Sequence, residues 1–333
     1  MIPEVKTNNV PLMEVRNIDK SFPGVKALDD VSVKFYPGEV NAVVGENGAG
    51  KSTLMKVMVG AYKQDEGTIL FQGQAVSFNH PIDAQKMGIS IIYQEFNLLP
   101  ERTVAQNIFL GREPSRYGVV NVRQLNKQAR SELKDIVVDE MISPTALTST
   151  LSVAEQQLVE IAKAISLDAR VLIMDEPTAS LTSTEVQLLS DLISRLKEKG
   201  LAIIFISHRL AEVFAVAEKI TVLKDGQYVG TAHTEEATPE DIVYMMVGRV
   251  LDHYVPPLGS PEDLGDVVLR VKDGANDFLS DINLELRKGE VLGIAGLQGS
   301  GRTELAEALF GAEPFKSGTV ELKGKPVSIK NPS

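Results

Sequence analysis

The sequence has 333 residues, and with 43% apolar and 24% charged residues its composition is that of a soluble globular protein with about two domains. Its formal net charge of −11 argues against a direct nucleic-acid partner, and the lack of cysteine excludes disulfides and thiolate metal sites. No apolar run reaches membrane-spanning length and residues 1–9 lack a signal-peptide core, so we expect a cytoplasmic protein that meets a membrane only through a partner.

A phosphate-binding loop is the first feature that carries chemistry. Residues 1–11 are predicted to form a loose tail, and short strands follow it, the last at Val40–Val44. The next stretch has the pattern G-x-x-x-x-G-K-[ST], and its glycines let backbone N–H groups surround phosphate oxygens. Lys51 can reach the terminal phosphates and the Ser52 hydroxyl can ligate Mg²⁺, so we predict an ATP and Mg²⁺ site followed by a helix. The loop residues are Gly45, Glu46, Asn47, Gly48, Ala49, Gly50, Lys51, Ser52 and Thr53.

Downstream of the loop the pattern predicts an α/β core with one helical insert. A hairpin around Gln72-Gly73 implies an antiparallel patch beside the parallel core. Helical periodicity dominates from about 96 to 166, after which strands and helices alternate again, and Asp225-Gly226 indicates a second hairpin. Further core strands are expected at 88–93, Val171–Met174 and Ala202–Ile206.

Four polar residues at the ends of predicted strands are candidates for catalysis or metal binding. Asp175 and Glu176 end the strand Val171–Met174. Asp175 would hold Mg²⁺ directly or through water, and Glu176 would orient or deprotonate an attacking water. Gln94 can touch the Mg²⁺ or the water, and His208 can contact the terminal phosphate, although a purely structural role is the alternative for both.

Two other features have a structural and a functional interpretation. Ser152 and Glu155 have capping-box spacing at the start of an amphipathic helix, and a helix N-terminus bearing Ser152 can also hydrogen-bond a γ-phosphate held by a facing domain. Phe22 lies upstream of the loop and can stack on adenine or pack in the core. The helix-opening segment comprises Leu151, Ser152, Val153, Ala154, Glu155, Gln156 and Gln157.

The end of the sequence repeats its beginning. Gly289-Glu290-Val291 matches Gly38-Glu39-Val40, and Gly296 matches Gly45 at an offset of 296 − 45 = 251 residues. In this copy Arg302 replaces the loop lysine, and its bulkier planar cation argues against tight ATP binding there. The predicted domains are 12–248, a linker at 249–266, and the N-terminal part of a duplicated, degenerate domain at 267–333.

Taken in chain order, the motifs resemble those of the ATP-binding-cassette (ABC) ATPases. They are Gly45–Thr53, Gln94, Leu151–Gln157, residues 174–178 and His208. The Gln156-Gln157 variant, the segments 179–182 and 244–249, and the second copy are similar to the duplicated ATPases of bacterial monosaccharide importers of the ribose, galactoside and xylose type. The resemblance covers about 12–333. It implies an α/β P-loop NTPase fold with a RecA-like core, an antiparallel β subdomain and a helical subdomain.

The resemblance also implies a function. It indicates an ATPase on the cytoplasmic face of the inner membrane, bound to a sugar permease that a periplasmic sugar-binding protein supplies. ATP is expected between two cassettes, with Gly45–Thr53 facing a second signature that this chain lacks, so slow turnover is expected for the chain alone. Because an acid beside a phosphate is unfavourable, Glu155 is expected to weaken the signature Leu151–Gln157.

Three alternatives remain open. The same ATPase role can serve nucleosides or a signalling sugar, because the residues that select the cargo lie in other proteins. A non-transport cassette acting on ribosomes or DNA is disfavoured by the net charge of −11 and the short helical insert. A catalytically inactive regulatory fragment is the third.

Overall fold

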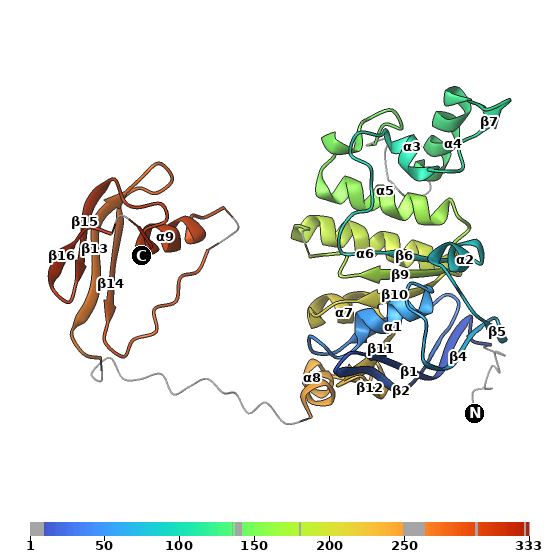
Figure 1. Ribbon diagram of the computed structural model, residues 1–333, viewed down its shortest axis with the longest axis horizontal. Helices are drawn as coiled ribbons and strands as arrows, with labels where there is room; N and C mark the ends of the chain where they lie inside the picture. The colour runs from blue at the N-terminus through green and yellow to red at the C-terminus, as the bar shows by residue number, and fades with distance from the viewer. Residues whose placement is uncertain are drawn as a thin grey trace. The chain divides into compact units, whose positions relative to one another are not determined.

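The computed structural model describes residues 10–134, 136, 142–179, 181–248, 264–296, 299–329 and 331–332. It divides into two compact units, Met1–Leu251 and Asp252–Ser333, called unit 1 and unit 2 below (Figure 1). The expected tail as far as residue 9, most of the expected linker, Ser180, Arg249, and the second-loop residues Leu297 and Gln298 lie outside the described residues.

The core of unit 1 is a six-stranded sheet made of β3 (Val40–Val44), β6 (Ile89–Ile92), β9 (Val171–Asp175), β10 (Ala202–Ile206), β11 (Lys219–Lys224) and β12 (Gln227–His233). The strand order is β12-β11-β3-β10-β9-β6, and only the β11–β12 pair is antiparallel. Because the parallel strands are covered on both faces, they are continuous apolar runs. Their carboxyl ends meet at one edge of the sheet, which places the residues that follow β3, β6, β9 and β10 near one another.

Two hydrophobic clusters, one on each face, hold this sheet. Ile203 and Phe205 of β10 belong to the cluster that includes α5 (Val153–Ile165), α6 (Ser183–Glu198), α7 (Leu210–Val216) and α8 (Pro239–Val247). Ile204 and Ile206 belong to the other cluster, which includes α1 (Lys51–Met58) and α2 (Pro81–Lys86). Alternate side chains of one strand therefore enter different cores, as the period of two requires.

An antiparallel sheet packs into the second cluster, as the hairpin signals predicted. Its strands are β1 (Met13–Phe22), β2 (Val25–Phe35), β4 (Glu66–Phe71) and β5 (Gln74–Val76), in the order β2-β1-β4-β5. Gln72 and Gly73 join β4 to β5 with φ of 52° and 77°, which is the positive-φ turn that matches strand twist.

The helical insert contains α3 (Val104–Ile108), α4 (Val122–Lys134), a 3₁₀ turn η1 (Thr148–Thr150) and α5. Between α3 and α4 lies a short hairpin, β7 (Ser115–Arg116) and β8 (Val119–Val120), that helical periodicity did not predict. Its two-residue strands are exposed, so they leave no burial pattern in the sequence. No helix in the described part of the chain is both long and apolar enough to cross a membrane.

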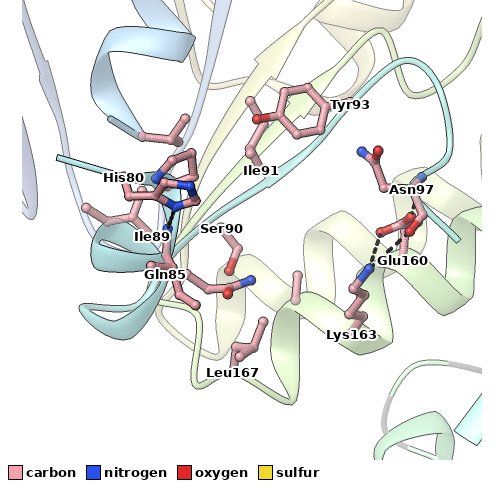
Figure 2. A pocket seen from close by; sticks show the side chains of 14 residues that line it. His80, Gln85, Ile89, Ser90, Ile91, Tyr93, Asn97, Glu160, Lys163 and Leu167 are labelled. Carbon is pink, nitrogen blue, oxygen red and sulfur yellow. Dashed lines mark hydrogen bonds and ion pairs between the residues drawn. The ribbon is translucent and has the colours of Figure 1, made fainter. Parts of the chain in front are cut away.

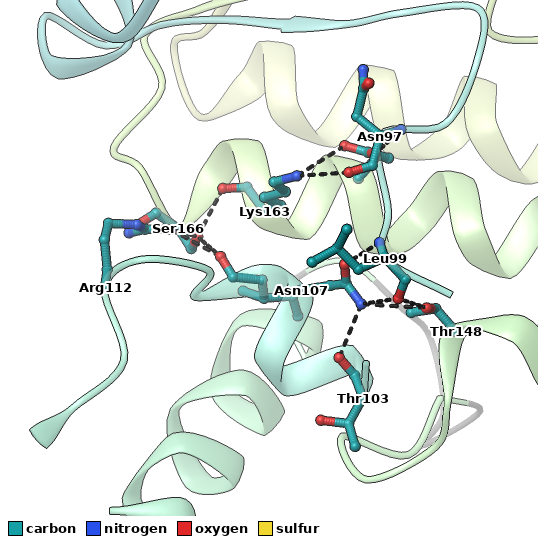
Figure 3. Close-up of polar contacts among 10 residues, drawn as sticks. Asn97, Leu99, Thr103, Asn107, Arg112, Thr148, Lys163 and Ser166 are labelled. Atoms are coloured by element: carbon teal, nitrogen blue, oxygen red, sulfur yellow. Dashed lines mark hydrogen bonds and ion pairs between the residues drawn. The ribbon is translucent and has the colours of Figure 1, made fainter. Parts of the chain in front are cut away.

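A buried asparagine ties the loop after β6 to this insert (Figure 3). The Asn107 side chain in α3 is fully buried; its Oδ1 accepts from Leu99 N at 2.7 Å. Its Nδ2 donates to Leu99 O at 3.1 Å, Thr103 O at 3.2 Å and Thr148 Oγ1 at 3.3 Å. One amide group thus satisfies backbone atoms of the loop and of α3, which fixes the loop to the insert.

Unit 2 repeats the antiparallel sheet of unit 1. Its strands are β13 (Val267–Ala275), β14 (Ile282–Arg287), β15 (Ser317–Leu322) and β16 (Lys325–Val327), in the order β14-β13-β15-β16, with the helix α9 (Arg302–Phe310). Segment 291–295, which matches β3 in the repeat, forms no strand.

Candidate functional site

The glycine-rich loop lies between β3 and α1, where the sequence placed it. Gly48 and Gly50 have φ of 87° and 98°, values that favour glycine. At Gly45 a Cβ atom would come within 2.3 Å of Leu223 O, so the close approach of β11 also requires glycine. No side chain caps the N-terminus of α1 at Gly50, which leaves its first N–H groups for a ligand.

Lys51 folds back over this loop. Its Nζ donates to Gly45 O at 2.8 Å and to Glu46 O at 3.0 Å, and the residue is only 7% exposed. Burial lowers the pKa of Lys51, and the nearby carboxylates of Glu176 and Asp175 act in the opposite direction. A buried cation next to free N–H groups makes the loop a receptor for an anion.

A cavity of about 380 Å³ brings the loop together with residues from other strand ends. Asp175 ends β9, Glu176 follows it, and Gln94 follows β6. Burial and the neighbouring Glu176 charge raise the pKa of Asp175. The lining residues are Ala27, Asn47, Gly48, Gly50, Lys51, Ser52, Thr53, Gln94, Asp175 and Glu176.

His208 is attached to this cavity through Glu176. His208 Nδ1 lies 3.0 Å from Glu176 Oε1, and the backbone N–H of Glu176 donates to Ile206 O at 3.0 Å. Glu176 has φ of 48°, a left-handed conformation that is uncommon for a residue with a side chain. The turn after β9 and the turn after β10 are therefore joined at both backbone and side-chain level.

Like His208, the predicted adenine platform Phe22 and the segment Leu151–Gln157 are not among the residues that line this cavity. Phe22 ends β1, is 37% exposed, and packs edge-on against Tyr62 with ring centroids 5.3 Å apart. Segment Leu151–Gln157 starts α5, where Ser152 Oγ accepts from Glu155 N and Glu155 Oε2 accepts from Ser152 N at 2.7 Å. The capping box is thus present, and the Glu155 carboxylate is turned onto its own helix end.

Ala27 lines the cavity although sequence reasoning did not predict it. Its backbone oxygen would lie 2.6 Å from a Cβ at Gly50, so strand β2 passes directly beside the loop. This contact is made by backbone atoms, so no residue type could signal it. His80 was also missed: its Nδ1 caps α2 by accepting from Ile82 N at 3.4 Å.

A second cavity, of about 350 Å³, lies between α2, β6 and α5 (Figure 2). Glu160 of α5 is 7% exposed, and its Oε1 accepts from Asn97 N at 2.8 Å in the loop that follows Gln94. Burial raises the pKa of Glu160, while Lys163 and the Asn97 hydrogen bond oppose this shift. The Gln94 loop is therefore tied directly to α5, whose first residue follows Ser152.

The ABC transporter family model matches residues 28–179 and 279–333. The chain belongs to the ABC transporter family. The two matched segments include the glycine-rich loop, Asp175 and Glu176 in the first cassette and Arg302 in the second. The cassette's fold is the α/β P-loop NTPase fold, with the parallel core, antiparallel sheet and helical insert described above.

Curated relatives are longer than this chain. It is 48% identical over 323 residues to ribose import ATP-binding protein RbsA 1 of Rubrobacter xylanophilus, covering 97% of this chain and 64% of that protein. It is 47% identical over 324 residues to a putative ribose/galactose/methyl galactoside import ATP-binding protein 1 of Burkholderia cenocepacia, covering 97% of this chain and 61% of that protein. The chain therefore spans less than two thirds of the length of these relatives.

Solved cassettes share the fold. An ATP-binding cassette of an ABC transporter in its ADP conformation superposes with a TM-score of 0.63 at 26% identity, covering 74% of this chain and 99% of that one. A dimeric cassette in a post-hydrolysis state, bound to ADP and Pi, gives a TM-score of 0.58 at 24% identity, covering 67% and 98%.

Proposed function

We propose that this chain binds Mg-ATP in the first cassette and hydrolyses it to drive import of a monosaccharide through a membrane permease. The observation that carries the proposal is the single cavity in which Lys51, Ser52, Gln94, Asp175 and Glu176 meet. A cation and free N–H groups suit phosphates, and the acids that line the same cavity suit a metal and a water.

In this proposal the loop and Lys51 bind the phosphates. Lys51 exchanges its bonds to Gly45 O and Glu46 O for β- and γ-phosphate oxygens, and the anion restores the pKa that burial lowers. Phe22, backed by Tyr62, is the proposed adenine platform.

The metal would be held by oxygen atoms of this chain and of the nucleotide. Ser52, Gln94 and Asp175 offer a hydroxyl, an amide and a carboxylate, the hard donors that Mg²⁺ prefers. No group of three or more His, Cys, Asp or Glu side chains in the described ranges could hold a metal without the nucleotide. That fits Mg²⁺, which binds through one or two carboxylates plus phosphates and neutralises charge at the transferred group.

Glu176 is the proposed general base. It would take a proton from water as the water oxygen bonds to the γ-phosphorus and the bond to the β–γ bridging oxygen breaks, yielding ADP and phosphate. His208, 3.0 Å from Glu176 Oε1, would hold the carboxylate and contact the γ-phosphate. Segment Leu151–Gln157 would present the α5 N-terminus to a nucleotide held by a facing cassette.

The partners follow from the relatives, which are named as sugar import ATP-binding proteins. We infer permease subunits at the cytoplasmic face of the inner membrane, supplied by a periplasmic sugar-binding protein. Nucleoside or signalling-sugar import remains the second candidate, because the residues that select the cargo are expected to lie in other proteins.

Transport reconstitution tests the proposal. Vesicles that contain a sugar permease of this importer type, with its binding protein and labelled ribose or galactose outside and this chain and ATP enclosed inside, should accumulate the labelled sugar. Replacing the wild type by Glu176→Gln should abolish uptake while fluorescent-ATP binding persists. Uptake that is indifferent to this substitution, or ATP binding that is absent from the wild type, would contradict the proposal.

A further inference from the structure

We propose that Glu212 is a positioning residue that joins the turn carrying Glu176 to the turn carrying His208. Glu212 lies in the first turn of α7, and its side chain is 13% exposed. Glu212 is not among the residues that line the cavity, so its effect would be exerted through the two turns. The inference deepens the proposed ATPase function and rests on it for its kinetic consequence.

The Glu212 carboxylate accepts hydrogen bonds from hydroxyl groups in both turns. Glu212 Oε2 accepts a hydrogen bond from Thr178 Oγ1, in the turn after β9, and another from Ser207 Oγ at 3.4 Å, in the turn after β10. Thr178 is 3% exposed and Ser207 is 2% exposed. Without Glu212, both buried hydroxyls would lose this acceptor, which is the more damaging half of breaking a buried hydrogen bond.

The second oxygen of Glu212 extends the contact around His208. Glu212 Oε1 accepts from Arg209 Nη1 at 3.1 Å, and Arg209 N donates to Ser207 Oγ at 3.0 Å. Ser207 and Arg209 are the residues on either side of His208. The backbone that presents His208 is therefore held from both sides by bonds that end on one side chain.

Backbone strain at Glu176 explains why such a support is needed. A left-handed φ of 48° at a residue other than glycine persists only when its surroundings enforce it. Glu176 N–H is held by Ile206 O, and Ala179 N–H donates back to Glu176 O at 3.2 Å. The Thr178–Glu212 bond adds the side-chain restraint inside this turn, two residues from the proposed base.

The inference predicts that removing Glu212 slows ATP hydrolysis and leaves nucleotide affinity unchanged. Glu212→Ala should lower the single-turnover hydrolysis rate on the order of 10- to 100-fold, the usual effect of removing an outer support. The Kd for fluorescent ATP should stay within about twofold, because the loop and Lys51 are untouched. Glu212→Gln, which keeps an acceptor oxygen, should fall between Ala and wild type.

Thr178 supplies the rescue and the coupling test. Thr178→Val keeps the volume and removes the hydroxyl, so it should reproduce the defect, whereas Thr178→Ser should restore the rate. The double variant Glu212→Ala with Thr178→Val should be little worse than Glu212→Ala alone, because Glu212→Ala already removes the Thr178–Glu212 bond. Additive losses would show that the two residues act separately.

Glu218→Gln is the matched control. Glu218 accepts from Val40 N at 2.8 Å and pairs with Lys197 at 2.5 Å, so it is also an anchoring carboxylate. It lies at the amino ends of β3 and β11, the opposite edge of the same sheet. Glu218→Gln should change the melting temperature, but it should leave the single-turnover hydrolysis rate and the Kd for fluorescent ATP unchanged.

Hydrogen–deuterium exchange of the full chain decides the structural claim independently of activity. The amides of Ala179 and Leu181, which donate to Glu176 O and Thr178 O, should exchange faster in Glu212→Ala but not in Glu218→Gln. Unchanged exchange and rate in folded Glu212 variants would overturn the inference. A wild type that neither binds nor hydrolyses ATP would instead overturn the proposed function, and the exchange result would still stand.

Discussion

The two copies of the repeat differ at their matched apolar segments, residues 40–44 and 291–295. In unit 1, residues 40–44 form β3, and every residue is at most 2% exposed. In unit 2, segment 291–295 forms no strand, and Val291 is 97%, Leu292 41% and Ile294 48% exposed. The antiparallel sheets nevertheless have the same order, and the matched residues Asp30 and Asp281 both have φ of 54°.

The difference shows where each element finds its partners. The strands of the antiparallel sheet pair within one copy's own residues, such as β1 with β2 and β4. Strand β3 instead pairs with β10 and β11, which follow it by more than 150 residues in the sequence. The described residues of unit 2 include no counterparts of β10 and β11. An apolar segment therefore becomes a buried strand only where neighbouring strands are present to pair with it.

The largest expected effect tests whether catalysis belongs to unit 1 alone. The described residues of unit 2 contain no counterpart of the β9 turn, so Glu176→Gln should lower ATP hydrolysis on the order of 10²- to 10⁴-fold. Binding should persist, because the loop is intact. A single-turnover assay with labelled ATP measures the rate, and substantial remaining hydrolysis would show a second catalytic group.

The next prediction compares the two loops. Lys51→Ala should weaken ATP binding by at least about 100-fold, because it removes the buried cation from the phosphate site. Arg302→Ala, at the matched position, should leave the stoichiometry and Kd of fluorescent-ATP titration unchanged. If instead the Lys51→Ala chain keeps its affinity and Arg302→Ala loses it, the assignment of the nucleotide to unit 1 is wrong.

A matched pair of core substitutions measures the comparison as stability. Val43 in β3 and Ile294 occupy the same repeat position (294 − 43 = 251), but one is fully buried and the other 48% exposed. Val43→Ala should lower the free energy of unfolding by about 2 kcal/mol. Ile294→Ala should change it by less than about 0.5 kcal/mol. Denaturant titration of the full chain gives both values, and equal losses would mean that segment 291–295 is buried in solution.

The smallest effect concerns the buried acid of unit 1. Burial and Glu176 raise the pKa of Asp175 in the folded state, so the folded state binds the proton more tightly than the unfolded state does. The free energy of unfolding is therefore highest at low pH, where Asp175 is protonated, and it falls as pH rises through the raised pKa. Asp175→Asn should therefore raise the melting temperature of nucleotide-free protein at pH 7 by a few degrees, about 2–4 °C for each kcal/mol. The gain should vanish below the ordinary aspartate pKa.

Nucleotide supplies the control for that prediction. With Mg-ATP present, the wild type should gain stability that Asp175→Asn does not, because the metal and phosphates need the carboxylate. Scanning fluorimetry at about pH 3 and pH 7, with and without Mg-ATP, separates the effect of burial from the effect of the nucleotide. If Asp175→Asn instead has a lower melting temperature than the wild type at pH 7 without nucleotide, burial of the Asp175 carboxylate does not destabilise the folded protein.

The positions of the glycine-rich loop, the paired acids and the strand ends were predictable from sequence because the patterns that mark them are local. Gly45–Thr53 must have its glycines and its lysine in a fixed order to surround a phosphate, and the strands around them are continuous apolar runs. The β7–β8 hairpin was not predictable, since exposed two-residue strands impose no pattern. The Glu212 contact was equally hidden, because its partners Thr178 and Ser207 lie in separate turns.

By itself, the sequence determined which segments could be strands or helices and which side chains could hold a phosphate, because those properties follow from residue type and short-range spacing. Tertiary structure decided which of two similar apolar segments became a buried strand and which carboxylates share a cavity. The reason is physical: strand pairing and burial depend on partners that are far away along the chain, and the same residues without those partners stay exposed to solvent.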